Sequence, residues 1–165
     1  MAKTKAQKGQ IIDTLADSFK SAATTVFVHF RGVNVTDETA MRRALGNADV
    51  KYTVAKKTLI RLALQKLGHS TEGMTLDGEV AAAYGGGDDA TAAARLVFEF
   101  GKKLTNRVQI LGGIFEGKIV DKAAMEEIAT IPSMQALRGM FANVINSPRT
   151  RFAIVLSKVA ETKTA

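Results

Sequence analysis

The segment Thr24–Phe30 limits the folds open to this chain more than any other feature. Its sequence, Thr-Thr-Val-Phe-Val-His-Phe, carries β-branched or aromatic residues on both of the alternating faces of a strand. A strand with two such faces is stable only when both are covered, so the segment predicts a central strand. Any fold proposed for the chain must therefore bury this segment in the middle of a sheet.

Helical and extended patterns alternate around that strand over the first 132 residues. Such alternation favours one sheet with helices packed against it, an α/β sandwich. Ile131-Pro132 then marks a domain boundary, so that we expect a domain at 1–132 and a tail at 133–165. The expected strands lie at 24–30, 50–55, 79–84, 107–115 and 118–120, and the expected helices near 11–19, 36–47, 56–67, 88–101 and from 121.

The tail carries a stripe of apolar residues at helical spacing. Ser133 is the expected cap of its helix, and Ser147-Pro148 is expected to divide the tail into two helical segments, because proline disfavours helical geometry in the residue before it. Such a stripe needs cover, either from the chain's own domain or from a partner protein. The candidate partner-binding residues are Leu137, Phe141, Val144 and Ile145 in the first segment, and Phe152, Val155, Leu156 and Val159 in the second.

Positive charge is concentrated near the start of the chain. Residues 1–71 hold 12 Lys and Arg against 5 Asp and Glu, within a chain of 165 residues whose net charge is +7. Such asymmetry indicates a polyanionic partner, although a solvated basic surface would look the same. Cysteine is absent and no run of about 18 apolar residues occurs, so we expect a cytoplasmic protein with no disulfide, no thiol chemistry and no membrane span.

The sequence has three clusters of cationic residues, one before a predicted helix, one at the end of a predicted strand and one on a predicted helix. Lys56-Lys57-Thr58 leads into a helix whose free amide groups would face the same phosphate as the two ammonium groups. Arg31-Gly32 ends the central strand, and Arg42-Arg43 lies on the next helix. Exposed aromatic residues are scarce, which favours contacts to the backbone of folded RNA over single-strand binding. The candidate RNA-binding residues are Lys8, Arg31, Gly32, Arg42, Arg43, Lys56, Lys57, Thr58 and Arg61.

Residues for catalysis or for metal binding are few. His29 falls in a predicted strand and His69 in a polar loop, so we interpret the first as a core residue and the second as a surface residue. Gly85–Asp89 precedes a helix as phosphate loops do, but it lacks the lysine and hydroxyl of a P-loop and is interpreted as a turn with a helix cap. We expect no enzyme, no cofactor, no metal and no small-molecule substrate; a small nucleotide-dependent enzyme is the weaker alternative.

Five short motifs run along the chain in a characteristic order: Phe30-Arg31-Gly32-Val33, Met41-Arg42-Arg43, Val54-Ala55-Lys56-Lys57-Thr58-Leu59, Gly112-Gly113 with Glu116-Gly117-Lys118, and Pro132-Ser133. In order and spacing they resemble the bacterial large-subunit ribosomal protein L-ten family, the stalk-base proteins related to P-zero. The resemblance covers essentially the whole chain. One departure is Lys57, where the resemblance leads us to expect asparagine.

The resemblance implies a ferredoxin-like sandwich of one mixed sheet with packed helices, seated on 23S ribosomal RNA beside ribosomal protein L-eleven. It also implies an extended C-terminal helical tail that carries dimers of the acidic stalk protein L-seven/L-twelve, which recruit translational GTPases. Two apolar segments suggest two dimers. Repression of the chain's own translation is a further implication, and a ribosome-assembly factor sharing the RNA-binding domain is the alternative.

Overall fold

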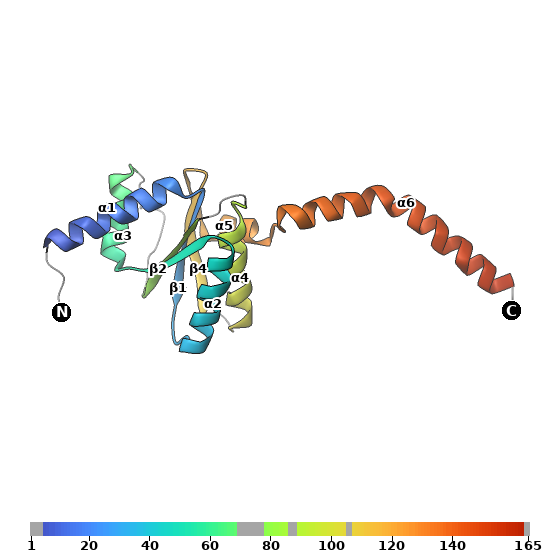
Figure 1. Ribbon diagram of the computed structural model, residues 1–165, viewed down its shortest axis with the longest axis horizontal. Helices are drawn as coiled ribbons and strands as arrows, with labels where there is room; N and C mark the ends of the chain where they lie inside the picture. The colour runs from blue at the N-terminus through green and yellow to red at the C-terminus, as the bar shows by residue number, and fades with distance from the viewer. Residues whose placement is uncertain (1–4, 69–77, 86–88, 105–106, 164–165) are drawn as a thin grey trace. The chain divides into compact units, whose positions relative to one another are not determined.

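The computed structural model describes residues 5–68, 78–85, 89–104 and 107–163 (Figure 1). Helices and strands alternate in it as the hydrophobic patterns predict. The strands are β1 (Thr24–Phe30), β2 (Val50–Val54), β3 (Val80–Gly85), β4 (Val108–Phe115) and β5 (Lys118–Asp121). The helices are α1 (Lys5–Ser21), α2 (Val35–Asn47), α3 (Lys57–Lys66), α4 (Ala92–Lys103), α5 (Lys122–Thr130) and α6 (Met134–Lys163).

The five strands form one sheet in the order β2-β3-β1-β4-β5. Its first four strands, with α2 and α4 as crossovers, have the order of the ferredoxin-like fold, so the fold is of the α+β class and the expected ferredoxin-like sandwich is confirmed. The sheet is not mixed as expected, because all of its four strand pairings are antiparallel. Strands joined by a crossover helix do run in the same direction, but another strand lies between them, and no parallel neighbours result.

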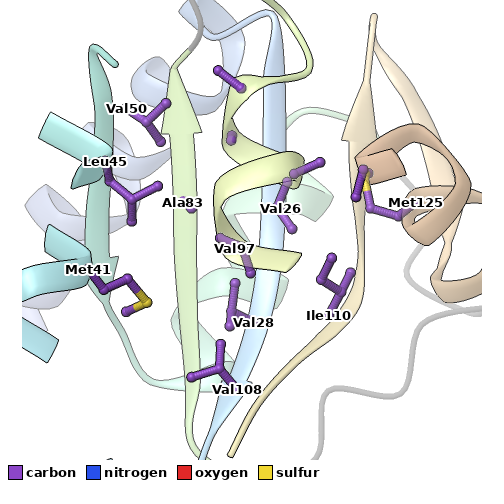
Figure 2. Close-up of a cluster of buried hydrophobic side chains, with 14 residues drawn as sticks. Val26, Val28, Met41, Leu45, Val50, Ala83, Val97, Val108, Ile110 and Met125 are labelled. Atoms are coloured by element: carbon purple, nitrogen blue, oxygen red, sulfur yellow. The ribbon is translucent and has the colours of Figure 1, made fainter. Parts of the chain in front are cut away.

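β1 lies at the centre of the sheet and is covered on both faces, as its sequence predicts. Val26 and Val28 contribute to a hydrophobic cluster with α2, α4 and α5, part of which Figure 2 shows. Phe27, between them in sequence, points to the other face and belongs to a second cluster with α1 and α3. All three side chains are fully buried. The domain therefore has three layers, with the sheet between two layers of helices.

Gly113 of β4 shows how closely β4 packs against β1 and α5. A Cβ atom at this position would overlap the Thr25 carbonyl oxygen and lie 2.7 Å from the methyl carbon of Met125. Because backbone cannot yield as a flexible side chain does, Gly113→Ala should lower the free energy of unfolding by about 2–3 kcal/mol. Urea unfolding followed by circular dichroism measures this change.

Gly46 of α2 is the matched control for Gly113. A Cβ there meets no atom within 4 Å, and the residue is helical. Gly46→Ala should stabilise the protein by about 0.5–1 kcal/mol, because alanine favours the helix. Equal effects of the two substitutions would contradict the close packing at β4.

The C-terminal segment is one continuous helix, α6, with Pro148 inside it. The expected division into two helices at Ser147-Pro148 is therefore wrong. Proline removes one main-chain hydrogen bond and bends a helix, whereas the bonds on either side can persist. α6 does bend about midway along its length (Figure 1). By its internal contacts the chain separates into two compact units, residues 1–131 and 132–165.

Candidate nucleic-acid interface and exposed helix

The register of the sheet brings two of the predicted cation clusters to the same end. Phe30 at the end of β1 lies opposite Val108, and Val54 at the end of β2 lies opposite Ala81 at the start of β3. Neighbouring strands are about 4.8 Å apart, so the ends of β1 and β2 are separated by roughly 10 Å. We call this end of the sheet the basic end; its cationic residues are Arg31, Lys56, Lys57 and Arg107.

α3 begins where the sequence predicts. Lys56 is its N-cap residue, and its carbonyl oxygen accepts hydrogen bonds from the amides of Leu59 and Ile60 at 2.9 and 3.2 Å. The amides of Lys57 and Thr58 precede these and, by their position in the first turn, have no acceptor within the helix. Both side chains are exposed, as is Arg61 one turn later. Amide donors and ammonium groups are thus placed together for an anion.

Two adjoining grooves lie at the basic end. They share Phe30, Gly78 and Glu79, and therefore join the end of β1 to the start of α3. The first, the lysine groove, is also lined by Val54, Ala55, Lys56, Lys57, Thr58 and Val80. The second, the arginine groove, is also lined by His29, Arg31, Gly32, Gln109 and Leu111.

Arg107 is a cation of the basic end that the sequence analysis missed. Its Nη1 donates a hydrogen bond to the carbonyl oxygen of Gly32 at 3.2 Å, and the Arg31 amide donates to the Arg107 carbonyl oxygen at 3.0 Å. Gly32 has a φ of +63°, a conformation that glycine adopts without strain. Arg107 precedes β4 in sequence, and only the pairing of β4 with β1 shows that it lies beside Arg31.

Arg42, Arg43 and Lys8 are not brought to the grooves. Arg42 on α2 pairs with Glu38 at 2.8 Å, and its guanidinium lies 5.0 Å from the centre of the Tyr52 ring. Burial raises the pKa of Tyr52 to about 12, with the Glu38 carboxylate adding to the shift. Arg43 is exposed on α2, and Lys8 is exposed on α1. In the part of the chain that the structure describes, none of the three lines either groove.

The residues considered for catalysis have structural partners instead. His29 is half-buried, and its Nδ1 lies 3.1 Å from the Glu79 carbonyl oxygen. Burial alone would raise the pKa of Asp89, but hydrogen bonds from Arg95 and Thr91 outweigh it and hold that pKa below its ordinary value. His69 and Asp88 lie outside the described residues. Within the described ranges, no three His, Asp or Glu side chains are grouped to hold a metal ion.

The apolar side chains of α6 are exposed along its whole length. Phe141 is 69% exposed and Phe152 is 66% exposed, and no residue of the helix is buried. At 100° per residue, the eight predicted partner-binding residues fall within about 120° of arc, because the helix continues through Pro148. We call this stripe the α6 apolar face. Its flanks carry Arg138, Arg149, Arg151 and Lys158, and it also includes Met134, which was not predicted from the sequence.

The described part of the chain thus combines a cationic end of its sheet with a helix whose apolar side chains are exposed. The family model for ribosomal protein L10 matches residues 3–102. "Large ribosomal subunit protein uL10" of Shouchella clausii (strain KSM-K16) is 36% identical over 163 residues, covering 99% of this chain and 97% of the relative. The protein of the same name from Oceanobacillus iheyensis is 32% identical over 157 residues, covering 95% of this chain and 93% of the relative.

The chain belongs to the ribosomal protein L10 family, as its motifs predict. It is a structural protein of the ribosome and not an enzyme, since the family and its named relatives are ribosomal proteins. The nucleotide-dependent enzyme considered from the sequence is thereby excluded. No helix in the described part of the chain is both long enough and apolar enough to cross a membrane.

Proposed function

We propose that this chain anchors the base of a stalk on the large ribosomal subunit. Its basic end binds 23S ribosomal RNA, and its α6 apolar face carries dimers of the acidic stalk protein L-seven/L-twelve. The names of its relatives, which are large-subunit proteins, support this location. The single observation that carries the proposal is that one chain has both features. Exposed cations lie at one end of its sheet, and its helix α6 buries none of its apolar residues.

The basic end supports the RNA contact. Arg31, Gly32, Lys56, Lys57 and Thr58 line two adjoining grooves, and Arg61 is exposed nearby on α3. Ammonium and guanidinium groups at strand ends, together with free helix amides, are typical phosphate ligands. Lys57 in place of the expected asparagine adds a cation here. Arg42, Arg43 and Lys8 would contact RNA only outside the grooves, and Arg42 only by leaving Glu38.

The α6 apolar face supports the acidic partner. Four anchors in each half of the helix would contribute about 6–12 kcal/mol when fully buried, which is comparable to the cost of association. The flanking arginines and lysines favour a partner with a negative surface. Leu137, Phe141, Val144 and Ile145 would hold one dimer, and Phe152, Val155, Leu156 and Val159 a second.

Further parts of the proposal follow from the stalk role. The chain would neighbour ribosomal protein L-eleven on the RNA, its acidic partners would recruit translational GTPases, and it would act in the cytoplasm. The same basic end would also bind the messenger RNA that encodes this chain, and this binding would repress its translation.

Native mass spectrometry of the complex purified from cells tests the proposal. We expect one copy of this chain with four copies of the acidic protein, that is, two dimers. A ribosome-assembly factor sharing the RNA-binding domain would bind ribosomal RNA without the acidic protein, so its absence from the complex would support that alternative.

A further inference from the structure

Glu79 is an unexpected residue for the lysine groove. It is exposed and lines both grooves between Lys56 and Arg31, where a phosphate-binding surface would be expected to carry only cations. Among the described residues, no ion pair joins Glu79 to a cation. A carboxylate repels phosphate and accepts hydrogen bonds only from N–H and O–H donors. Its place in the groove therefore favours a ligand that has hydrogen-bond donors as well as a phosphate.

The segment that carries Glu79 is held firmly against β1. The Phe30 amide donates a hydrogen bond to the Glu79 carbonyl oxygen at 3.3 Å, and His29 Nδ1 lies 3.1 Å from the same oxygen. Gly78 has a φ of +73°, and a Cβ there would overlap the His29 ring. Only glycine lets the chain pass so close to the ring. The position of Glu79 is thus set by the fold.

The remaining lining of the lysine groove is largely apolar. Phe30 is half-buried, and Val54 is 47% exposed. Together with the half-buried Ala55 they form an apolar surface beside Lys56 and Lys57. The groove has a volume of about 600 Å³, within the range of small-molecule sites. Unstacked RNA bases bind such surfaces by stacking, with their Watson–Crick edges hydrogen-bonded to polar groups.

Of the common bases, guanine best matches a groove that combines a carboxylate, an apolar surface and two lysines. Its N1–H and N2–H₂ groups are two adjacent donors, which a carboxylate can accept in a bidentate pair. Adenine and cytosine offer one amino group beside an acceptor, and uracil offers one N–H between two acceptors. A carboxylate is repelled by the acceptors of these three bases, so it discriminates among the four.

We propose that the lysine groove receives one unstacked guanine nucleotide of the bound RNA, with the base against Phe30 and Val54, its Watson–Crick edge on Glu79, and its phosphate on Lys56 and Lys57. This inference rests on the proposed function, because it names which part of the RNA this surface recognises.

Nucleotide titrations of the full chain, followed by the ¹H–¹⁵N NMR signals of the groove residues, test the inference. GMP should bind about tenfold more tightly than IMP, which lacks the N2 amino group, and than AMP, CMP or UMP. Glu79→Gln should abolish this preference, while inorganic phosphate should still bind, at least as tightly as it does to the unaltered chain, because a repelling charge is removed. Glu99→Gln, which removes one exposed carboxylate from α4, is the matched control and should retain the preference.

Equal binding of GMP and IMP by the unaltered chain would overturn the inference without any variant having to fold. The proposed function is tested separately with a 23S ribosomal RNA transcript. If the transcript binds and Lys56→Glu weakens it while GMP shows no preference, the basic end binds RNA but reads no guanine. If the transcript fails to bind, the proposed function itself is wrong.

Discussion

Phe141→Asp should halve the number of acidic partner dimers that one chain carries, and adding Phe152→Asp should remove them all. Each phenylalanine is the largest apolar side chain in its half of α6, and each is about two-thirds exposed in the chain alone. Aromatic anchors at the centre of an interface typically cost at least 2 kcal/mol when lost, and a buried aspartate adds a desolvation penalty. Each substitution should therefore weaken its site by more than about 30-fold. Native mass spectrometry counts the copies that remain.

Ile154→Asp provides the matched control on the same helix. Ile154 is 50% exposed, but at 100° per residue it lies about 160° away from Phe152, outside the α6 apolar face. Its replacement should leave both dimers bound. Circular dichroism should show the same helix content in all three variants, because none of these side chains is buried. Loss of the partner in the Ile154 variant as well would contradict binding through one face of α6.

Lys56→Glu with Lys57→Glu should reduce affinity for 23S ribosomal RNA by at least about 100-fold near 0.1 M salt. Charge-assisted hydrogen bonds to phosphate contribute about 1.5–3 kcal/mol each, and reversing the charge adds repulsion. Loss of two phosphate contacts should also make the slope of log K against log salt shallower by about 1.4–1.8. Filter binding over a range of salt concentrations measures both quantities. Partner binding by α6 should be unchanged.

The control is the double variant Lys51→Glu with Lys118→Glu. It changes the net charge of the domain by the same amount as Lys56→Glu with Lys57→Glu does. Both lysines are exposed, and their pairings with Tyr84 and Phe115 place them at the opposite end of the sheet. This control should lower RNA affinity only slightly, through the long-range field. Equal losses in the two double variants would mean that overall charge, and not the basic end, attracts the RNA.

The sequence predicted individual elements better than their assembly. The two apolar faces of Thr24–Phe30 predicted a central strand, and the cations before Leu59 predicted the start of α3, because both signals are local. The pairing of the sheet as antiparallel, the nearness of Arg107 to Arg31 and the capture of Arg42 by Glu38 and Tyr52 depend on which elements become neighbours. Pro148 misled the prediction because its local preference to end a helix is only a few kcal/mol.

By itself the sequence determined most of the helices and strands, that basic residues precede an apolar C-terminal segment, and which family the motifs resemble. Hydrophobic period, turn residues and charge are properties of neighbours along the chain, and they act before any tertiary contact forms. Only the tertiary structure decided that β3 lies between β1 and β2, and that Glu79 lines the grooves between Lys56 and Arg31. These depend on strand register, which packing and backbone hydrogen bonds set across long separations in sequence.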